Sequence, residues 1–553
     1  MPTVHSDLQY HASGCYSAHS GIKRWIRQAE TLLLSAERWS SIAAQLTTHK
    51  YPENLDLAWK NLLFNQFHDI LAGTSLESAY ADSRNQLGET MSIANRAFNS
   101  AVQSIAWHMD IPQQDGTFPV VVFNPNPWPC NLKVELEMGF VTMPKGDEVV
   151  FDAQGEPQPI QLVQSQATTP FRSRVIFNAN LPCLGYSLYR IGPRLENKAF
   201  PILKASDHLI ENKFIRLKID PQNGCIESLY DKEHGIEVIT SPAALPVVIL
   251  DPSDTWSHGI NKFDQVLGHF RPAKIHLVEN GAVKSVLRVE SVYESSTITQ
   301  DFCLYADTKL VTVNVIVDWH QQHQMLKLRF PVNIHSYKAA FEIPYGYINR
   351  PTNGTELPGQ TWVDLTGLSN VNGNPYGLSL LNDGKYSFDI LDNDIGLTVL
   401  RSPIYAHHTP AVPQPGRSYQ YIDQGVQHFS YALFPHADGW QEAGTVKAAA
   451  ELNQSPFALA VTSHPGNLPI SGSFISIDCE NILVTVLKKA EDNDDLVLRA
   501  YETVGQPTPV TITLPEMHRK IKAVFTPFEI KTFLVPKPGN FPVIETNLLE
   551  FQE

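Results

Sequence analysis

The stretch HSGIKRWIRQAETLLLSAERWSSIAAQL (residues 19–46) has apolar side chains at helical spacing along its whole length. The apolar positions are Ile22, Trp25, Ile26, Ala29, Leu32, Leu33, Ala36, Trp39, Ile42, Ala43 and Leu46. A period near 3.6 residues is typical of an amphipathic helix that buries one broad stripe. The stretch therefore predicts that the chain begins with helices packed through apolar faces.

Two more helices are expected after this one. The second is predicted from about Glu53 to Ala72, with Gly73 as its C-terminal stop. Thr74 and Glu77 have the spacing of a capping box, which predicts the start of a third helix. Three helices with short connections predict an antiparallel three-helix bundle over residues 1–112.

After Pro112 the sequence changes to a β pattern rich in β-branched and aromatic residues. The segments FPVVVFNPNPWPCNLKVELEM (118–138), SVLRVESVYESS (285–296) and KLVTVNVIVDW (309–319) are typical of strands. Strands and helices do not alternate, which favours antiparallel sandwiches. The predicted fold class is α+β multidomain, with the bundle followed by β-sandwich domains. We place a small β domain at 113–204, a central β super-sandwich at 205–450 and a C-terminal β-sandwich at 451–553.

Composition narrows the class of protein. The chain has 553 residues and a formal net charge of −15, which argues against nucleic acid as a partner. Its six cysteines form no CxxC pair, which excludes a thiolate zinc site of that type and favours a cytoplasmic location. No apolar run approaches the roughly 18 residues that a membrane helix needs, so no membrane partner is expected.

The stretch NQFHDILAGTS (65–75) carries polar residues at the end of an apolar helix. Asn65, His68 and Asp69 fall on neighbouring turns of one side. In one interpretation His68 is a zinc ligand beside a carboxylate that binds a substrate hydroxyl. In the other, His68 is an ordinary histidine near a helix C-terminus, where a cation is mildly favoured. The residues alone leave both interpretations open.

Two other segments hold candidate binding residues. Asp383 lies in a loop between strand-like runs, and Arg350 begins the segment RPTNGTELPGQTWVDL (350–365). In SDTWSHG (253–259), Trp256 offers an aromatic face for a sugar ring. An ordinary hairpin turn and a packed surface loop are the commoner explanations of the same residues. No pair of carboxylates stands out for glycoside hydrolysis, and GxSxG, P-loop and HExxH motifs are absent from the sequence.

Several longer segments resemble the C-terminal portion of glycoside hydrolase family 38, the α-mannosidases, and in particular their bacterial members. The segments are LQYHASGCYSAHSGIKRWIRQAETLLLSAERWS, LLFNQFHDILAGTSLESAYADS, ENKFIRLKIDPQNGCIESLYDKEHG, KLRFPV, GLSLLNDGKYSFDI, LTVLRSPIY, HFSYALFPHADGW and ILVTVLKKAEDNDDLVLRAYE. They occur in the family's order over nearly the whole chain.

The resemblance implies roles for two residues. His68 matches the family's zinc-ligating histidine, and Asp69 matches the neighbouring carboxylate that contacts sugar hydroxyls. The family's other zinc ligands, its aspartate nucleophile and its acid/base aspartate belong to an N-terminal α/β domain, and they have no counterpart in this sequence. We therefore expect the chain alone to be an incomplete enzyme, with zinc held by one ligand from this chain and the rest from elsewhere.

Two functions remain open from the sequence. The first is the bundle and β-domain portion of a zinc-dependent retaining α-mannosidase, with a mannoside or oligosaccharide as substrate and a separate catalytic fragment as partner. Homo-oligomers are also expected, because the surface around His68 would be uncovered and apolar. The alternative is a non-catalytic β-sandwich protein that binds glycans or scaffolds an assembly.

Overall fold

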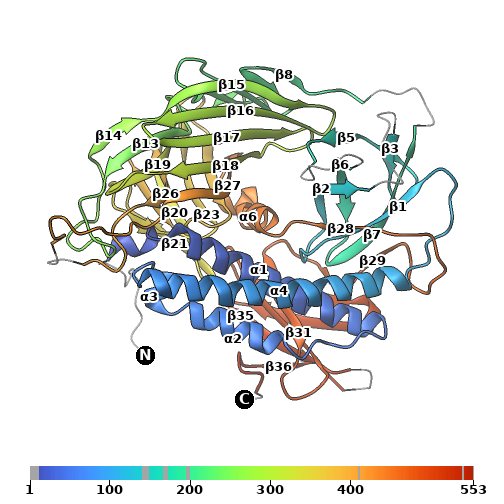
Figure 1. The fold of residues 1–553 in the computed structure, drawn as a ribbon. Coiled ribbons are helices and arrows are strands. Elements are labelled where there is room, and N and C mark those ends of the chain that lie inside the picture. The colour runs from blue at the N-terminus through green and yellow to red at the C-terminus, as the bar shows by residue number, and fades with distance from the viewer. Residues whose placement is uncertain are drawn as a thin grey trace.

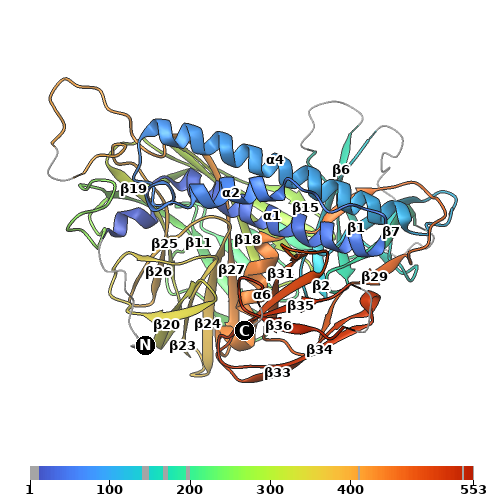
Figure 2. The ribbon, with the colours of Figure 1, turned by 90° about the horizontal axis from the view of Figure 1, so that it is seen from below.

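The computed structural model describes residues 12–139, 148–165, 172–194, 200–408, 412–537 and 541–551. It combines four N-terminal helices with many antiparallel sheets, as the sequence predicts at this coarser level. The helices lie side by side along one flank of the molecule, and the sheets fill the rest (Figures 1 and 2). Among the described residues, no helix is both long and apolar enough to cross a membrane.

The helical part contains two long helices and two short ones. After the short helix η1 (Ser13–Tyr16) come α1 (Ser20–Leu46), α2 (Leu55–Asn65), α3 (His68–Leu71) and α4 (Glu77–His108). Most of the apolar stripe of residues 19–46 is buried as predicted. Its first part, from Ile22 to Ala36, packs with the inner faces of α2 and α4, and its last part, from Trp39 to Ala43, packs with α4 and the neighbouring β regions. The shared core includes Ile22, Ile26, Leu33, Leu55, Leu62, Leu87 and Ala94.

The predicted second helix is wrong over its last turns. It ends at Asn65, and Phe67 has φ −52° and ψ 141°, which is outside the helical region. A separate single turn, α3, then starts at His68. Asn65 remains in α2 and points into the helical core, where its amide donates to Gln86 at 2.7 Å. Asn65 is therefore separated from His68 by the break and serves the packing of α2 on α4.

The predicted capping box does not form. Leu76 is the N-cap residue of α4, without a side-chain hydrogen bond. The Thr74 hydroxyl instead donates to the backbone carbonyl and the Oδ1 atom of Asp69, both at 3.2 Å. A hydrogen bond within the turn, over five residues, takes the place of the predicted cap.

The central β region contains three sheets, of nine, six and five strands. A nine-stranded sheet has the order β15 (Arg271–Asn280), β16 (Lys284–Tyr293), β17 (Ser296–Tyr305), β18 (Val311–Trp319), β27 (Gly425–Ala437), β24 (Pro375–Asn382), β23 (Trp362–Ser369), β20 (Ile334–Ile343) and β21 (Gly346–Arg350). A six-stranded sheet has the order β14 (Val266–His269), β13 (Leu245–Leu250), β19 (Gln324–Pro331), β26 (Asp394–Arg401), β25 (Ser387–Leu391) and β22 (Leu357–Pro358). A five-stranded sheet has the order β12 (Ile236–Glu237), β11 (Ile226–Asp231), β10 (Ile215–Ile219), β9 (Leu209–Glu211) and β8 (Lys204–Ser206).

These sheets share one apolar core. Alternate residues of β18, namely Val311, Val313, Val315 and Val317, are buried in the same cluster as Leu326 and Leu328 of β19. This alternation is the period-2 pattern that predicted the strand. The named strand pairs of the structure are antiparallel, in agreement with the sandwich prediction (for example β17 with β18 and β18 with β27).

Two smaller β regions lie beside the helices. The first contains β28 (Phe457–Ala460), β1 (Phe118–Phe123), β7 (Gly185–Pro193), β3 (Glu148–Phe151), β4 (Pro157–Gln158) and β29 (Ser471–Ser473), with the sheet β2 (Cys130–Met138), β6 (Ser173–Leu181) and β5 (Ile160–Val163). The second contains β30 (Ser476–Ile477), β33 (Thr508–Leu514) and β34 (Arg519–Phe525), and β31 (Ile482–Lys489), β32 (Leu496–Glu502), β35 (Ile530–Val535) and β36 (Ile544–Thr546). The short helices α5 (Trp440–Ala443) and α6 (Thr445–Asn453) connect β27 to β28, and η2 (Pro515–Met517) follows β33.

Candidate functional site around His68

The turn between α2 and α4 presents His68 to solvent. The imidazole side chain is 77% exposed, and its Nε2 atom lies 3.6 Å from the Oδ2 atom of Asp69, which is 46% exposed. The Phe67 ring lies against the imidazole, with 4.1 Å between ring centroids. The break at Phe67 therefore turns His68 and Asp69 outward as an adjacent imidazole–carboxylate pair.

Asp69 is held more firmly than His68. Its backbone carbonyl accepts hydrogen bonds from the hydroxyls of Thr74 and Tyr80, each at 3.2 Å. Its Oδ1 atom accepts a second bond from Thr74. These contacts fix the carboxylate before any ligand arrives, which lowers the entropy that binding would cost.

The turn is anchored on the start of α1 by a buried lysine. The Lys23 ammonium group donates to the carbonyls of Ala18, at 2.6 Å, and Leu71, at 2.9 Å. Burial lowers the pKa of Lys23 to about 7, partly opposed by nearby Cys15 and Asp423. Gly73 has φ +84°, and a Cβ atom there would lie 2.3 Å from the Ala18 carbonyl oxygen. The turn can approach α1 this closely only with glycine at position 73.

The loop that contains Trp256 lies on the same side of the molecule. The Gly14 N–H donates to the Trp256 carbonyl at 3.2 Å, which joins this loop to the segment before α1. Burial raises the pKa of Cys15 in that segment, and the charges of Asp69 and Asp254 both add to the effect. The segment before α1 therefore contacts both predicted regions, the Trp256 loop through Gly14 and the His68 turn through Ala18.

Within that loop, Trp256 is half-buried. Asp254 accepts the backbone N–H of Trp256 at 3.1 Å, and its Oδ2 atom lies 2.7 Å from Nδ1 of His258. The buried Arg401 donates to the carbonyl of Asp254 and to the Ser257 hydroxyl. The loop is thus a well-ordered turn with one aromatic face partly open.

Asp383 and Arg350 lie elsewhere. The Oδ1 atom of Asp383 accepts the Ser430 N–H at 2.8 Å, and burial raises the pKa of this carboxyl. Arg350 ends β21, donates to the Pro358 carbonyl and lies 5.1 Å from the centroid of the Phe341 ring. In the described parts of the chain, no hydrogen bond or ion pair links either residue to the His68 turn. Their roles in substrate binding remain predictions.

The metal-binding capacity of the turn is limited. A structural or catalytic zinc ion needs at least three protein ligands, and the described residues around His68 offer one imidazole and the adjacent Asp69 carboxylate. The only group of three or more metal donors among the described residues is Asp231, Glu233 and His234, after β11. Asp231 is already committed there to Tyr376 and His234, both at 2.8 Å. The residues described around His68 do not form a zinc site by themselves.

The sequence interpretation missed the residues that support the turn. Lys23 and Tyr80 occupy ordinary positions within long helices, and nothing in the local pattern distinguishes them. His19 is the exception, because it directly precedes the apolar stripe at the place of an N-cap. Its Nδ1 atom accepts the Ile22 N–H at 3.1 Å, and its ring stacks on that of Tyr80.

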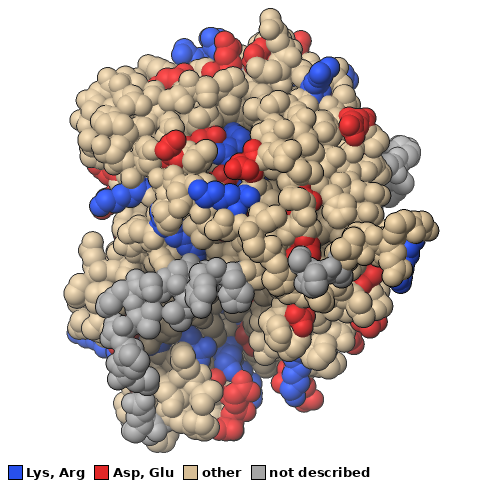
Figure 3. All heavy atoms as spheres, turned by 90° about the vertical axis from the view of Figure 1, so that its left-hand side faces the viewer, with Lys and Arg blue, Asp and Glu red and all other residues tan. Residues whose placement is uncertain are grey.

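The surface on this side is mixed in charge. Figure 3 looks at the side of the molecule that lies at the left of Figure 1, and it shows acidic and basic side chains interspersed over mostly uncharged atoms. Apolar side chains are exposed around His68, namely Leu63, Phe64, Phe67 and Leu76. Such a surface is unsuited to a polyanion and is typical of a protein contact.

Comparison with known families identifies the chain. Residues 9–105 match the family described as alpha mannosidase middle domain. Residues 210–415 match the glycosyl hydrolases family 38 C-terminal domain, and residues 481–525 match the C-terminal beta sandwich domain of the same family. The chain carries middle and C-terminal domains of glycoside hydrolase family 38. The family 38 resemblance seen in the sequence is confirmed, and these matches do not favour a non-catalytic scaffold.

Curated relatives cover the chain nearly end to end. The chain is 27% identical to "Alpha-mannosidase G" of Dictyostelium discoideum over 94% of its own length and 51% of the relative's. It is 25% identical to "Alpha-mannosidase 2C1" of Mus musculus over 96% of its length and 50% of the relative's. The chain therefore spans about half the length of the curated relatives that it matches.

Solved structures show the same fold. An alpha-mannosidase from Enterococcus faecalis V583 matches 95% of this chain and 68% of its own, with a TM-score of 0.77 and 18% identity. A glycosyl hydrolase family 38 protein from Enterococcus faecalis matches 95% of this chain and 71% of its own, with a TM-score of 0.79 and 18% identity. The arrangement of helices and sheets is thus the arrangement of this family.

Proposed function

We propose that this chain forms the middle and C-terminal part of a zinc-dependent retaining α-mannosidase that acts on α-mannosidic bonds of glycans or oligosaccharides. In this proposal α1, α2 and α4 form the three-helix bundle of the middle domain. His68 supplies one zinc ligand, and Asp69 accepts hydrogen bonds from the hydroxyls of the bound mannoside. The nucleophile and the acid/base carboxylate come from protein outside this sequence.

One observation carries the proposal. His68 and Asp69 form an outward-facing pair on a turn that is fixed from behind by Lys23, Thr74 and Tyr80. Exposed Phe64 and Phe67 lie beside the pair. An imidazole and a carboxylate that face outward beside exposed apolar side chains can form one half of a binding site. A second protein surface would supply the other half and would bury the apolar side chains.

The chemistry assigned to this chain is binding and orientation. When bound, zinc would orient the hydroxyls of the sugar and stabilise charge there. The Asp69 carboxylate is acceptor-only when ionised, so it suits the hydroxyl donors of a sugar. A retaining reaction needs two more carboxylates about 5 Å apart, and we assign neither to this chain.

The compartment is part of the proposal. All six cysteines of the chain are free thiols in the structure, and four of them are buried. Structural disulfides are rare in reducing compartments. The free thiols support a cytoplasmic location.

Hydrolysis of a chromogenic α-mannoside with added zinc tests the proposal. We expect no turnover by the purified chain or by His68→Ala, because the catalytic carboxylates are not in this chain. If the wild-type chain hydrolyses the substrate and His68→Ala does not, the chain holds a complete site and the assignment of a partial site is wrong.

A complementation experiment tests the role of His68 directly. Addition of a separately produced catalytic α/β domain of the family should give hydrolysis with the wild-type chain and at least a hundredfold less with His68→Ala. His335→Ala is the matched control, since His335 is also exposed but lies on β20. Equal activity of His68→Ala and His335→Ala would show that His68 is not a ligand.

A further inference from the structure

A groove of about 680 Å³ lies between the helices and the β regions. Its walls are formed by α1 from Arg27 onward, the second half of α4, and the end of α6 with the segment that follows it, while β1 contributes Phe123. The lining begins one helical turn after Lys23, the residue that contacts the His68 turn. No residue of the His68 turn (65–75) belongs to the lining, so the groove and the candidate site are built from different residues.

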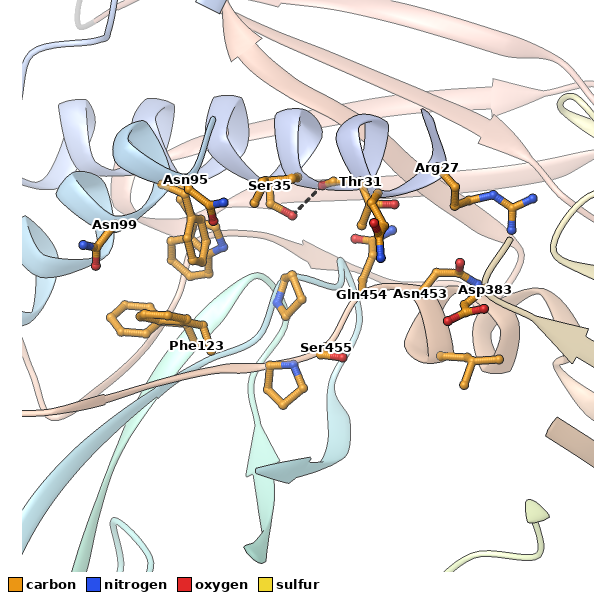
Figure 4. A pocket seen from close by; sticks show the side chains of 18 residues that line it. Arg27, Thr31, Ser35, Asn95, Asn99, Phe123, Asp383, Asn453, Gln454 and Ser455 are labelled. Atoms are coloured by element: carbon orange, nitrogen blue, oxygen red, sulfur yellow. Dashed lines mark hydrogen bonds between the residues drawn. The ribbon is translucent and has the colours of Figure 1, made fainter. Parts of the chain in front are cut away.

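The lining of the groove combines side-chain amides, hydroxyls and aromatic rings. Figure 4 places Arg27 and Asp383 at one end, Asn95, Asn99 and Phe123 at the other, and Thr31, Ser35 and Gln454 between them. Arg27 and Asp383 are the only ionisable groups of the lining, and their charges are opposite. The groove thus favours an uncharged ligand with many hydroxyl groups over an anion or a cation.

Aromatic rings form an apolar floor. The Phe98 and Phe457 rings meet edge to face with 5.0 Å between centroids, and Trp39 meets Phe123 in the same way at 5.1 Å. All four residues line the groove. An apolar aromatic floor below a small number of polar groups is the usual composition of a small-molecule site, and 680 Å³ is within the usual range of volumes.

Several polar groups of the lining have no protein partner. Arg27 is a buried side chain whose Nε atom donates to the Tyr386 hydroxyl at 2.8 Å, while its Nη2 atom is buried without any hydrogen-bond partner. A buried donor without a partner costs free energy, which a ligand oxygen would recover. Among the described residues, the exposed side chains of Gln28 and Asn95 make no hydrogen bond and are open to a ligand without first breaking a protein contact.

Other groups of the lining are fixed in place. The Gln454 Oε1 atom accepts a hydrogen bond from Arg38 at 3.1 Å, and the Asn453 amide donates to the Asn382 carbonyl at 3.0 Å. The Asn453 amide also donates to the Ala449 carbonyl at 2.9 Å, so both of its N–H groups are engaged. Among the described residues, the Nε2 group of Gln454 makes no hydrogen bond and is available to a ligand. Fixed and available groups together make a preorganised site.

We propose that this groove is a second, non-catalytic carbohydrate-binding site that takes a neutral mono- or oligosaccharide. The ring faces of the sugar pack on Phe98 and Phe457, which are partly exposed, and its hydroxyls bond with Arg27, Asp383 and the amides. The site contains neither His68 nor Asp69, so it stands independently of the proposed enzymatic function. Asp383, which the sequence marked as a substrate-binding residue, belongs to this groove.

Isothermal titration calorimetry with methyl α-mannoside and an α-linked mannotriose tests the site, with sodium sulfate as a charged control. We expect binding of a sugar to the wild-type chain and no binding of sulfate. The variant Gln28→Ala/Asn95→Ala should bind at least tenfold more weakly, because two hydrogen bonds to the sugar are lost. Asp383→Asn should also weaken binding.

Two controls separate this site from the His68 turn and from general effects. His68→Ala should bind the sugar as the wild type does, and Asn85→Ala should do the same, since Asn85 is an exposed amide on α4 outside the groove lining. Equal affinity of the groove variants and the wild type would overturn the proposal. Absence of sugar binding at tens of millimolar, or loss of binding in His68→Ala alone, would overturn it as well.

Discussion

At the residue scale, His19 shows how one buried imidazole couples the helical region to pH. Its Nδ1 atom caps α1 by accepting the Ile22 N–H, and its ring stacks on Tyr80 with 3.9 Å between centroids. Burial lowers the pKa of His19 to about 3, and the charge of Lys23 adds to this effect. Protonation would place a hydrogen on the capping atom and a charge in the core, so the folded protein keeps this ring neutral.

The stability of the protein should therefore fall in acid through His19. The pKa of the folded state lies below the value near 6.5 of an exposed histidine, so the unfolded chain binds the proton first as the pH falls. The contribution of neutral His19 to the free energy of unfolding is complete above pH 6.5, and it is lost progressively as the pH falls toward 3. Between pH 7 and 5 this loss amounts to roughly 2 kcal/mol.

The variant His19→Asn provides the test. Asparagine can cap the helix without titrating and tolerates the positive φ of this position. Urea unfolding at pH 7 and pH 5 should show a smaller loss of stability in the variant than in the wild type. An equal loss in both proteins would mean that His19 does not carry the acid sensitivity.

At the scale of elements, the connection from α2 to α4 depends on one glycine. Gly73 has φ +84°, and a Cβ atom added there would lie 2.3 Å from the Ala18 carbonyl oxygen. We expect Gly73→Ala to lower the free energy of unfolding by about 2 kcal/mol or more, because it adds both backbone strain and a clash with backbone atoms.

Gly88 is the matched control on the neighbouring element. It lies inside α4, and a Cβ atom there would meet no atom within 4 Å. Gly88→Ala should raise the free energy of unfolding by roughly 0.5–1 kcal/mol, because alanine favours the helix. Thermal unfolding of both variants measures the difference. If both substitutions shift the midpoint of thermal unfolding in the same direction, the close approach of the turn to α1 does not explain the need for glycine at position 73.

Strand pairing at this scale links segments far apart in the sequence. Val120 in β1 pairs with Ala460 in β28, and Ser187 in β7 pairs with Ser471 in β29. Residues after 451 thus complete a sheet that begins near residue 118. The predicted domain boundaries at 113–204 and 451–553 do not anticipate this exchange, and as boundaries they remain predictions.

At the scale of the whole molecule, the exposed apolar surface around His68 should drive self-association of the isolated chain. Leu63, Phe64, Phe67 and Leu76 are each more than half exposed. We expect oligomers or poor solubility in size-exclusion chromatography with light scattering, and Phe64→Ser/Phe67→Ser should shift the protein toward monomer.

Leu549→Ser serves as the control for this experiment, because Leu549 is an exposed apolar residue near the other end of the chain. It should leave the association state unchanged. A monodisperse monomer of the wild-type chain would contradict the prediction, as would an equal effect of the two sets of substitutions.

The sequence by itself determined the elements and their class. The 3.6-residue period of residues 19–46 and the alternation in residues 309–319 were enough, because one buried face imposes that spacing on a helix or a strand. The resemblance to family 38 also identified the chain and directed attention to His68 and Asp69.

Only the tertiary structure decided how the site is built. The break at Phe67 and the bond from Thr74 to Asp69 arise because the turn packs on α1, and local propensity predicted a longer helix with a capping box. The groove at Arg27 and Asp383 is formed by segments more than 350 residues apart in the sequence. Contacts between such distant residues depend on how the helices and sheets pack on one another, and a local sequence pattern contains no information about this packing.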